Sequence, residues 1–310
     1  MKLLWRFYRK LKPFSQFEGR RDFSLCDGLR LVSGQEAHNR IIGAIASGEA
    51  LSVMRTGGVE AQIIMWGLGL KTLGRFGVSY PTFYWETKSG PTNAGIRPRN
   101  HDSYREFARL AGQAAGAADV LGVWHAPYEE VIYRHSQPRA LACHVEKLSP
   151  TFRVKDHWIR HLGRQRLLVF SPFEDSIRSQ LPKMNDIWAP LDLDWTARVD
   201  TYRFPYLIDD ACPLHWKEVY SSCVERLEQD DYDIAMFGCG GLGIPLAKIA
   251  KQRGKIGMHL GGLLQLLFGI YGSRHTDQFW HAECINMHWK RPEPSERAQS
   301  FKRVEGGCYW

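Results

Sequence analysis

Apolar residues in this chain occur in two patterns, short unbroken runs and helical periods, separated by glycine, proline or polar residues. The short runs are typical of strands buried on both faces, and they lie at residues 50–54, 166–170, 232–237 and 255–260. Apolar residues three or four apart predict helices at residues 35–47, 102–117, 215–228 and 244–252. Because strands and helices alternate, we predict an α/β fold whose mostly parallel, Rossmann-like sheet carries helices on both faces.

Irregular composition marks the connections. Residues 81–101 are rich in proline, glycine and asparagine and predict a loop, after which Asp102 is expected to cap a helix. Residues 123–162 show no clear period, and a further strand is expected near residues 198–204. Residues 275–310 predict an irregular segment that aromatic side chains anchor, namely Trp280, Trp289, Tyr309 and Trp310.

Composition narrows the class of protein. Of the 310 residues, 44% are hydrophobic and 24% are charged, which is typical of a globular protein and excludes a disordered or fibrous chain. The longest apolar run, residues 260–271, is interrupted by glycines and is shorter than the roughly 20 residues of a membrane span. The seven cysteines are scattered without a CxxC pair, so we expect reduced thiols in a cytoplasmic protein and no structural zinc site.

The positive charge is concentrated at the amino terminus. The chain has 41 basic and 33 acidic residues, a net charge of +8, and residues 1–21 hold seven basic residues and one acidic residue, or +6. We expect this tail to precede one domain over residues 22–310, with halves at 22–162 and 163–310. Because the domain is nearly neutral, nucleic acid is not an expected partner. Aromatic residues and leucines between the tail's cations suit the inner face of an anionic membrane, and a helix docked on its own domain is the alternative.

A glycine-rich turn lies between a predicted strand and a predicted helix. Gly238, Gly240 and Gly243 fit the pattern G-x-G-x-x-G, in which glycines let backbone N–H groups approach a diphosphate. A dinucleotide site also needs a carboxylate after the next strand, and residues 258–261 contain none. A nicotinamide-dependent oxidoreductase is therefore disfavoured. A turn that serves only strand-to-helix packing is the alternative interpretation.

Two other strand ends carry polar residues. Ser171 opens a helix and either offers its hydroxyl to an anion or caps that helix. Arg55 and Glu60 flank two glycines after a buried strand, where ligands of open parallel sheets collect. Glu60 is a candidate base and Arg55 a phosphate partner. The alternative is an ion pair between them that braces the turn.

Residues 52–60 (SVMRTGGVE) resemble the strand and R-x-G-D-G-E signature of the GT-D-fold glycosyltransferases, bacterial enzymes that transfer a sugar from a nucleotide donor. The resemblance extends in order along residues 35–310. The segments that carry it are residues 93–95, 119–122, 171–173, 233–262, 286–292 and 304–310.

The resemblance implies a GT-D-like fold, a donor at the carboxyl edge of the sheet, and Glu60 as the base or the carboxylate that orients the sugar, with Asp119 as an alternative. The implied donor is a UDP-sugar, and the implied acceptor is a cell-surface polysaccharide or a lipid-linked glycan. The residues expected to bind the donor are Arg55, Gly57, Gly58, Asn93, Ser171, Gly238, Gly240, Gly243, His259, Gln265 and Arg274. For His259, a purely structural role is the alternative.

The chain departs from the signature at position 58, where glycine stands in place of the acidic residue. The family's acidic pair is read as a motif for the donor and for a divalent ion, Mg²⁺ or Mn²⁺. With Glu60 alone, the expectation is donor binding without a metal, in which Arg55, Arg274 or a helix N-terminus offsets the charge of the leaving diphosphate. A non-catalytic protein that binds a nucleotide or glycan during polysaccharide assembly is the alternative function.

Overall fold

The computed structural model describes residues 29–70, 94–124, 127–152, 154, 156–209, 212–276, 282–303 and 306–310. The predicted tail, Asn93 and Trp280 lie outside the described residues. Six of the seven cysteines are described, and each carries a free thiol.

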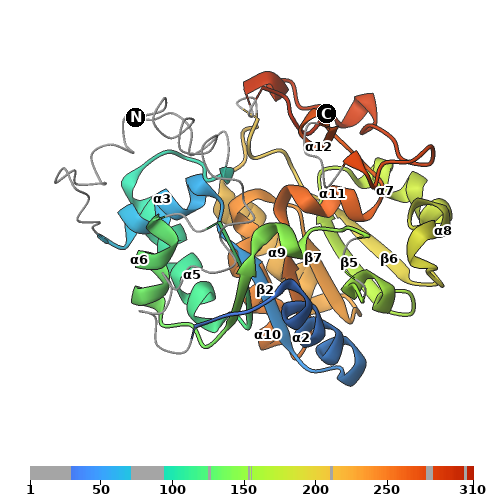
Figure 1. The fold of residues 1–310 in the computed structure, drawn as a ribbon. Helices are drawn as coiled ribbons and strands as arrows, with labels where there is room; N and C mark the ends of the chain where they lie inside the picture. Colours follow the sequence, from blue (N-terminus) through green and yellow to red (C-terminus); the bar gives the residue numbers. More distant parts are fainter. Residues whose placement is uncertain are drawn as a thin grey trace, which may run out of the picture.

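The described chain forms one eight-stranded sheet in which every pair of neighbouring strands is parallel (Figure 1). The predicted α/β class is therefore confirmed, and strands from both predicted halves join in one sheet. From edge to edge, the strands are β1 (Arg30–Leu31), β4 (Leu141–His144), β3 (Val120–Val123), β2 (Leu51–Arg55), β8 (Ile256–His259), β7 (Ile234–Phe237), β5 (Arg166–Ser171) and β6 (Arg198–Arg203).

The two halves of the sheet meet at β2 and β8. Leu51 pairs with Ile256 and Val53 pairs with Met258, and all four residues are buried. Strands that are covered on both faces have no polar side, which explains why the sequence shows them as unbroken apolar runs.

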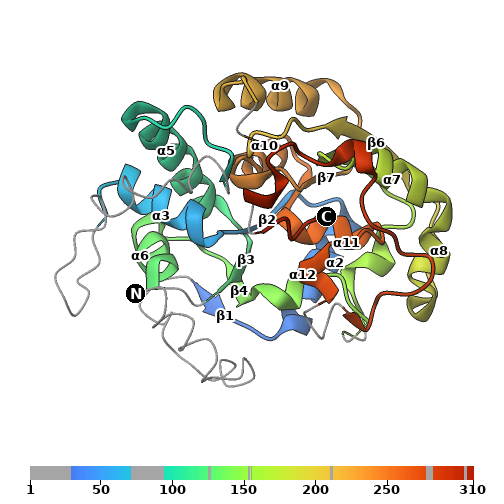
Figure 2. The same ribbon diagram turned by 90° about the horizontal axis from the view of Figure 1, so that it is seen from above.

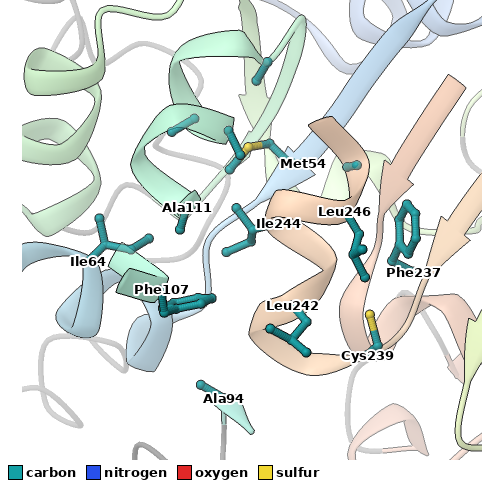
Figure 3. Packing of buried hydrophobic residues seen from close by; sticks show 14 of the residues in the cluster. Met54, Ile64, Ala94, Phe107, Ala111, Phe237, Cys239, Leu242, Ile244 and Leu246 are labelled. Atoms are coloured by element: carbon teal, nitrogen blue, oxygen red, sulfur yellow. The ribbon is translucent and has the colours of Figure 1, made fainter. Parts of the chain in front are cut away.

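One face of the sheet is covered by five helices whose apolar residues form a single cluster with the strands. They are α3 (Gly58–Gly67), α5 (His101–Ala117), α6 (Pro127–Ser136), α9 (Trp216–Gln229) and α10 (Gly243–Gln252). Figure 3 shows Met54 of β2 and Phe237 of β7 packed with Phe107 of α5 and Ile244 of α10. Helix α10 lies very close to β8, because a Cβ on Gly257 would be 2.3 Å from the carbonyl oxygen of Ala247.

The other face carries a second apolar cluster from shorter helices and the carboxyl-terminal segment. Figure 2 shows α2 and α11 on this side and α5, α9 and α10 on the opposite side. The elements of this layer are α2 (Gly34–Ser47), η3 (Val145–Leu148), η4 (Trp158–His161), α7 (Glu174–Gln180), η5 (Leu181–Lys183), α8 (Met184–Ile187), η6 (Ala189–Leu191), α11 (Leu264–Leu267) and α12 (Ser273–Thr276).

Short turns and buried anchors complete the fold. The remaining turns are η7 (Gly240–Leu242), η8 (Gly261–Leu263), η9 (Pro294–Glu296) and η10 (Phe301–Arg303). The described part of the carboxyl-terminal segment is irregular, as predicted, and Trp289 and Trp310 are buried. The prediction that Asp102 caps α5 is wrong. The Asn100 side chain caps this helix by accepting a hydrogen bond from the Ser103 N–H, so Asp102 lies within the first turn.

Candidate functional site

The carboxyl ends of β2 and β8 lie side by side, and the chain leaves them toward opposite faces. Helix α3, after β2, packs in one apolar cluster, and α11, after β8, packs in the other. In open parallel sheets, ligands bind where the connections after neighbouring strands diverge in this way. Arg55 ends β2, Glu60 lies in the first turn of α3, and His259 ends β8.

Arg55 extends its side chain from β2 across to the turn after β8. Its Nη2 atom lies 2.7 Å from the point that a Cβ on Gly261 would occupy, and Gly261 has a φ of +57°. Only glycine combines this backbone conformation with such a close approach. The guanidinium also lies 5.7 Å from the ring centroid of Trp124, which follows β3. Arg55 therefore connects the ends of three neighbouring strands.

A buried carboxylate holds the loops around Arg55, and nothing in the sequence pattern indicated it. Glu129 is 1% exposed, accepts a hydrogen bond of 3.0 Å from the Thr56 hydroxyl and one of 2.9 Å from the Trp124 N–H. It thereby connects the loop after β2 to the loop after β3. Glu130, the next residue, is more exposed and pairs with Arg134, and the sequence offers no signal that separates the two glutamates.

Glu60 lies over the start of its own helix and against the glycine turn. Its Oε2 atom is 2.1 Å from the position of a Cβ on Gly57, and its Cγ atom is 3.3 Å from that of a Cβ on Gly241. A side chain larger than hydrogen at Gly57 would displace the carboxylate. The structure thus brings Gly57, Glu60 and the turn after β7 together at the carboxyl edge of the sheet.

The glycines of the turn at residues 238–243 are each packed against other parts of the protein. A Cβ on Gly238 would be 2.9 Å from Leu264, and one on Gly240 would be 2.9 Å from the carbonyl oxygen of Ala94. Gly240 also has a φ of +60°. Protein atoms therefore fill the space beside Gly240 that a bound diphosphate would need. These contacts favour the packing interpretation of the turn, which still positions Glu60 and His259.

His259 is a buried, neutral imidazole between the turn and Arg55. Burial, the nearby charge of Arg55 and, in the opposite direction, the Phe237 carbonyl leave its pKa lowered to about 3. Its Nδ1 atom is 2.1 Å from the position of a Cβ on Gly243 and is buried without a hydrogen-bond partner among the described residues. A neutral His259 adds no positive charge to that of Arg55.

Asp119 lies at the opposite edge of the sheet from these residues. It precedes β3, accepts a hydrogen bond of 2.8 Å from the Ser52 N–H at the start of β2, and pairs with Lys251 at 2.7 Å. The resemblance implied that Asp119 is an alternative to Glu60 at the carboxyl edge, but Asp119 lies at the amino end of β3. Asp119 is therefore withdrawn as an alternative to Glu60, because it cannot reach a substrate at the carboxyl edge.

Three further predicted residues make structural contacts away from Glu60. The Ser171 hydroxyl accepts a hydrogen bond of 3.1 Å from the Phe173 N–H and so stabilises the turn before α7. Phe173 is the N-cap residue of α7 and no side chain caps this helix, so the capping interpretation of Ser171 is wrong. Gln265 is buried, and its amide donates to the carbonyl oxygens of Ile270 and Tyr309. The Arg274 guanidinium lies 4.9 Å from the ring centroid of Tyr309.

The residues present do not fit the divalent ion that the resemblance implies. Gly58 provides no ligand, so Glu60 is the one carboxylate of the motif, whereas Mg²⁺ and similar ions take several oxygen ligands. Within the described ranges, no three histidine, cysteine or acidic side chains are grouped as a metal site.

Comparisons of the chain with protein-family models, with curated proteins and with solved structures find no match. In the described parts of the chain, no helix is both long enough and apolar enough to cross a membrane.

Proposed function

We propose that this protein is a glycosyltransferase that moves a sugar from a nucleotide-sugar donor, a UDP-sugar, to a hydroxyl group of a cell-surface polysaccharide or lipid-linked glycan. The observation that carries the proposal is the convergence of Arg55, Glu60 and His259 where the connections after β2 and β8 diverge. The resemblance of residues 52–60 to the GT-D signature supports the same assignment.

The chemistry assigns one role to each charged residue. Glu60 takes the proton of the acceptor hydroxyl while the acceptor oxygen forms a bond to the anomeric carbon of the sugar. The bond between that carbon and the donor's phosphate oxygen breaks, and the electron pair leaves with the diphosphate. Arg55, a permanent cation next to a neutral His259, offsets the negative charge that develops on the leaving group.

The basic, aromatic tail would place the proposed transferase at a membrane surface. Its net charge of +6 over residues 1–21 would attract an anionic membrane surface, at about 1 kcal/mol for each cation near the lipid. A transferase held on the inner face of the membrane would meet lipid-linked acceptors there.

A nucleotide- or glycan-binding accessory protein is the second candidate, and glycine at position 58 is the observation that favours it. The two candidates differ in what they do with a nucleotide sugar: a transferase binds it and turns it over, whereas an accessory protein only binds it. A ligand that binds only the folded state at 100 times its Kd adds about 2.7 kcal/mol to the stability, which a melting experiment detects.

The test is a panel of nucleotide sugars, first in thermal melting and then in an assay for release of the nucleoside diphosphate, with and without Mg²⁺ or Mn²⁺. We expect one donor to raise Tm and to be hydrolysed or transferred by the full chain. A donor that raises Tm but is never turned over would support the accessory protein. A panel with neither effect would refute both the transferase and a nucleotide-binding accessory protein.

A further inference from the structure

A second polar feature lies at the start of α9, outside the site around Glu60. Residues 97–99 and 212–215 line an open depression of about 440 Å³. Its described lining includes two guanidinium groups, those of Arg97 and Arg99, together with the imidazole of His215, and it includes no acidic side chain. Guanidinium groups match the oxygens of phosphate in paired hydrogen bonds.

Arg97 is fixed in the wall of this depression. Its Nε donates a hydrogen bond of 2.9 Å to the Leu207 carbonyl, and its own carbonyl accepts one of 3.0 Å from the Trp216 N–H. The positive charges of Arg97 and Arg99 also interact electrostatically with the Tyr104 hydroxyl group. Burial raises the pKa of Tyr104 to about 12, and Arg99 and Arg97 act to lower it. Two positive charges therefore converge on one small region that the fold holds in place.

The amino end of α9 adds to this positive potential. His215 precedes the first turn of this 14-residue helix, and its Nδ1 accepts a hydrogen bond of 3.1 Å from the Lys217 N–H. The aligned peptide dipoles make this end of a helix favourable for an anion. Here the dipole supplements the arginines, while the Glu218 carboxylate, which accepts a hydrogen bond of 3.4 Å from the His215 N–H, offsets part of this potential.

The depression is close to Glu60. The Ala94 carbonyl oxygen and the Glu60 Cγ atom lie 3.2 and 3.3 Å from the same point, the position of a Cβ on Gly241. Arg97 follows Ala94 by three residues, a span of at most about 11 Å between their Cα atoms. The depression and Glu60 therefore lie near the same chain segment, residues 94–97, and an elongated substrate that followed this segment would contact both.

Apolar groups complete the lining. Pro98 and Pro213 contribute apolar surface, and Leu214 is 39% exposed, whereas the other leucines in the described ranges are buried or partly buried. We infer that the depression binds the diphosphate group of a substrate that also carries an apolar or ring-shaped moiety. The identity of the substrate rests on the proposed function, whereas the binding of a diphosphate group in the depression does not. That diphosphate belongs either to the nucleotide donor or to a lipid-linked acceptor.

Calorimetric titration of the full chain with inorganic pyrophosphate tests this binding without any transfer reaction. We expect Arg99→Gln to weaken binding about tenfold or more, because it removes a charge-assisted, forked contact. Arg99→Lys keeps the positive charge and loses the forked pair of N–H donors. Its Kd for pyrophosphate should therefore lie between those of the wild-type chain and of Arg99→Gln. Arg109→Gln removes an exposed arginine of α5 outside the depression and should leave the Kd unchanged.

Competition against pyrophosphate by UDP and by geranyl diphosphate then identifies the donor or the acceptor as the source. Melting curves of each variant verify folding. No pyrophosphate binding by the wild-type chain, or equal weakening by Arg99→Gln and Arg109→Gln, would overturn the inference. Because pyrophosphate binding needs no sugar donor, it can be found even if every nucleotide sugar fails as a substrate, and the two proposals can fail separately.

Discussion

At the scale of single residues, the site is organised by side chains that lie directly over glycines. Glu60 lies over Gly57, Arg55 over Gly261 and His259 beside Gly243. The glycine pattern could be predicted from the sequence, but not what fills the space beside each glycine. The neighbouring atoms come from residues far away in the chain, which only the folded topology brings close.

Gly243→Ala tests this packing. The new Cβ would be 2.1 Å from the Nδ1 atom of His259, so the buried ring must move. We expect the free energy of unfolding to fall by about 1–3 kcal/mol, as for other overpacked cores. Gly43→Ala, at an exposed position of α2, meets no described atom within 4 Å and should instead stabilise the protein by about 0.5–1 kcal/mol. Urea unfolding measures both, and an unaffected Gly243→Ala protein would contradict the observed contact.

Gly58→Asp restores the acidic residue of the GT-D signature. A Cβ at this position meets no described atom within 4 Å, and an acid in the first turn of α3 interacts favourably with the helix dipole. We expect stability to change by less than about 0.5 kcal/mol and calorimetry to detect binding of Mn²⁺ that the wild-type chain lacks. If Mn²⁺ affinity is the same with and without Asp at 58, Gly58 is not what distinguishes this chain from the family.

At the scale of elements, sequence and structure agree where the apolar period is strong. The predicted strands at residues 166–170 and 232–237 and the helix at 35–47 are present within a few residues. β4 and α6 could not be predicted, because residues 123–162 mix charged and apolar positions without a period. The place of Asp119 at the amino end of β3 could not be predicted either, since a four-residue strand has no local signal that separates its start from its end.

Two buried histidines connect α2 to the turns η3 and η4. His38 Nε2 contacts the Lys147 carbonyl at 2.7 Å, and its Nδ1 accepts from the Trp158 N–H; His157 Nδ1 accepts from the Ile159 N–H. Burial lowers the pKa of both below the usual 6.5, and for His157 the neighbouring His38 lowers it further. The neutral forms are therefore the ones that the fold accommodates.

The stability should accordingly fall in acid. Below pH 6.5 the unfolded chain binds protons at these histidines and the folded chain does not, so the free energy of unfolding decreases as pH falls. The slope is at most about 1.4 kcal/mol per pH unit for each histidine. Urea unfolding between pH 7.5 and 5 should be less pH-dependent in His38→Gln. His259 contributes equally to both proteins, so equal slopes would contradict the prediction.

Glu296 attaches the carboxyl-terminal segment to α7. This carboxylate is 2% exposed and accepts hydrogen bonds from the Asp175 and Ser176 N–H groups and the Ser176 hydroxyl at the start of α7. Glu296→Ala should therefore cost about 1–3 kcal/mol, because the buried Ser176 N–H and the partly buried Asp175 N–H lose their acceptor. Glu293→Ala, which removes a partly exposed pair with Lys290, should cost less than about 1 kcal/mol. Equal losses in chemical denaturation would show that Glu296 is no more than a surface contact.

At the scale of the whole molecule, the β2–β8 pair joins the two halves of the sheet and determines where a site can form. The alternation of strands and helices in the sequence predicted a mostly parallel sheet. It did not predict the order of the strands, because nothing local in residues 51–55 and 256–259 specifies that these two strands are neighbours. That pairing is what brings Arg55, Glu60 and His259 to one place, so the candidate site could be predicted only as separate strand ends.

The central claim is that Glu60 acts as the base of a sugar transfer, and its most direct test is the turnover of a UDP-sugar by Glu60→Gln. The glutamine keeps the shape of the side chain and loses the proton acceptor, so the rate should fall about 10²–10⁴-fold. Glu36→Gln is the matched control, since Glu36 occupies the same helical position in α2 that Glu60 occupies in α3. We expect near wild-type turnover from Glu36→Gln and similar melting temperatures for both variants. Wild-type turnover by folded Glu60→Gln would contradict the account.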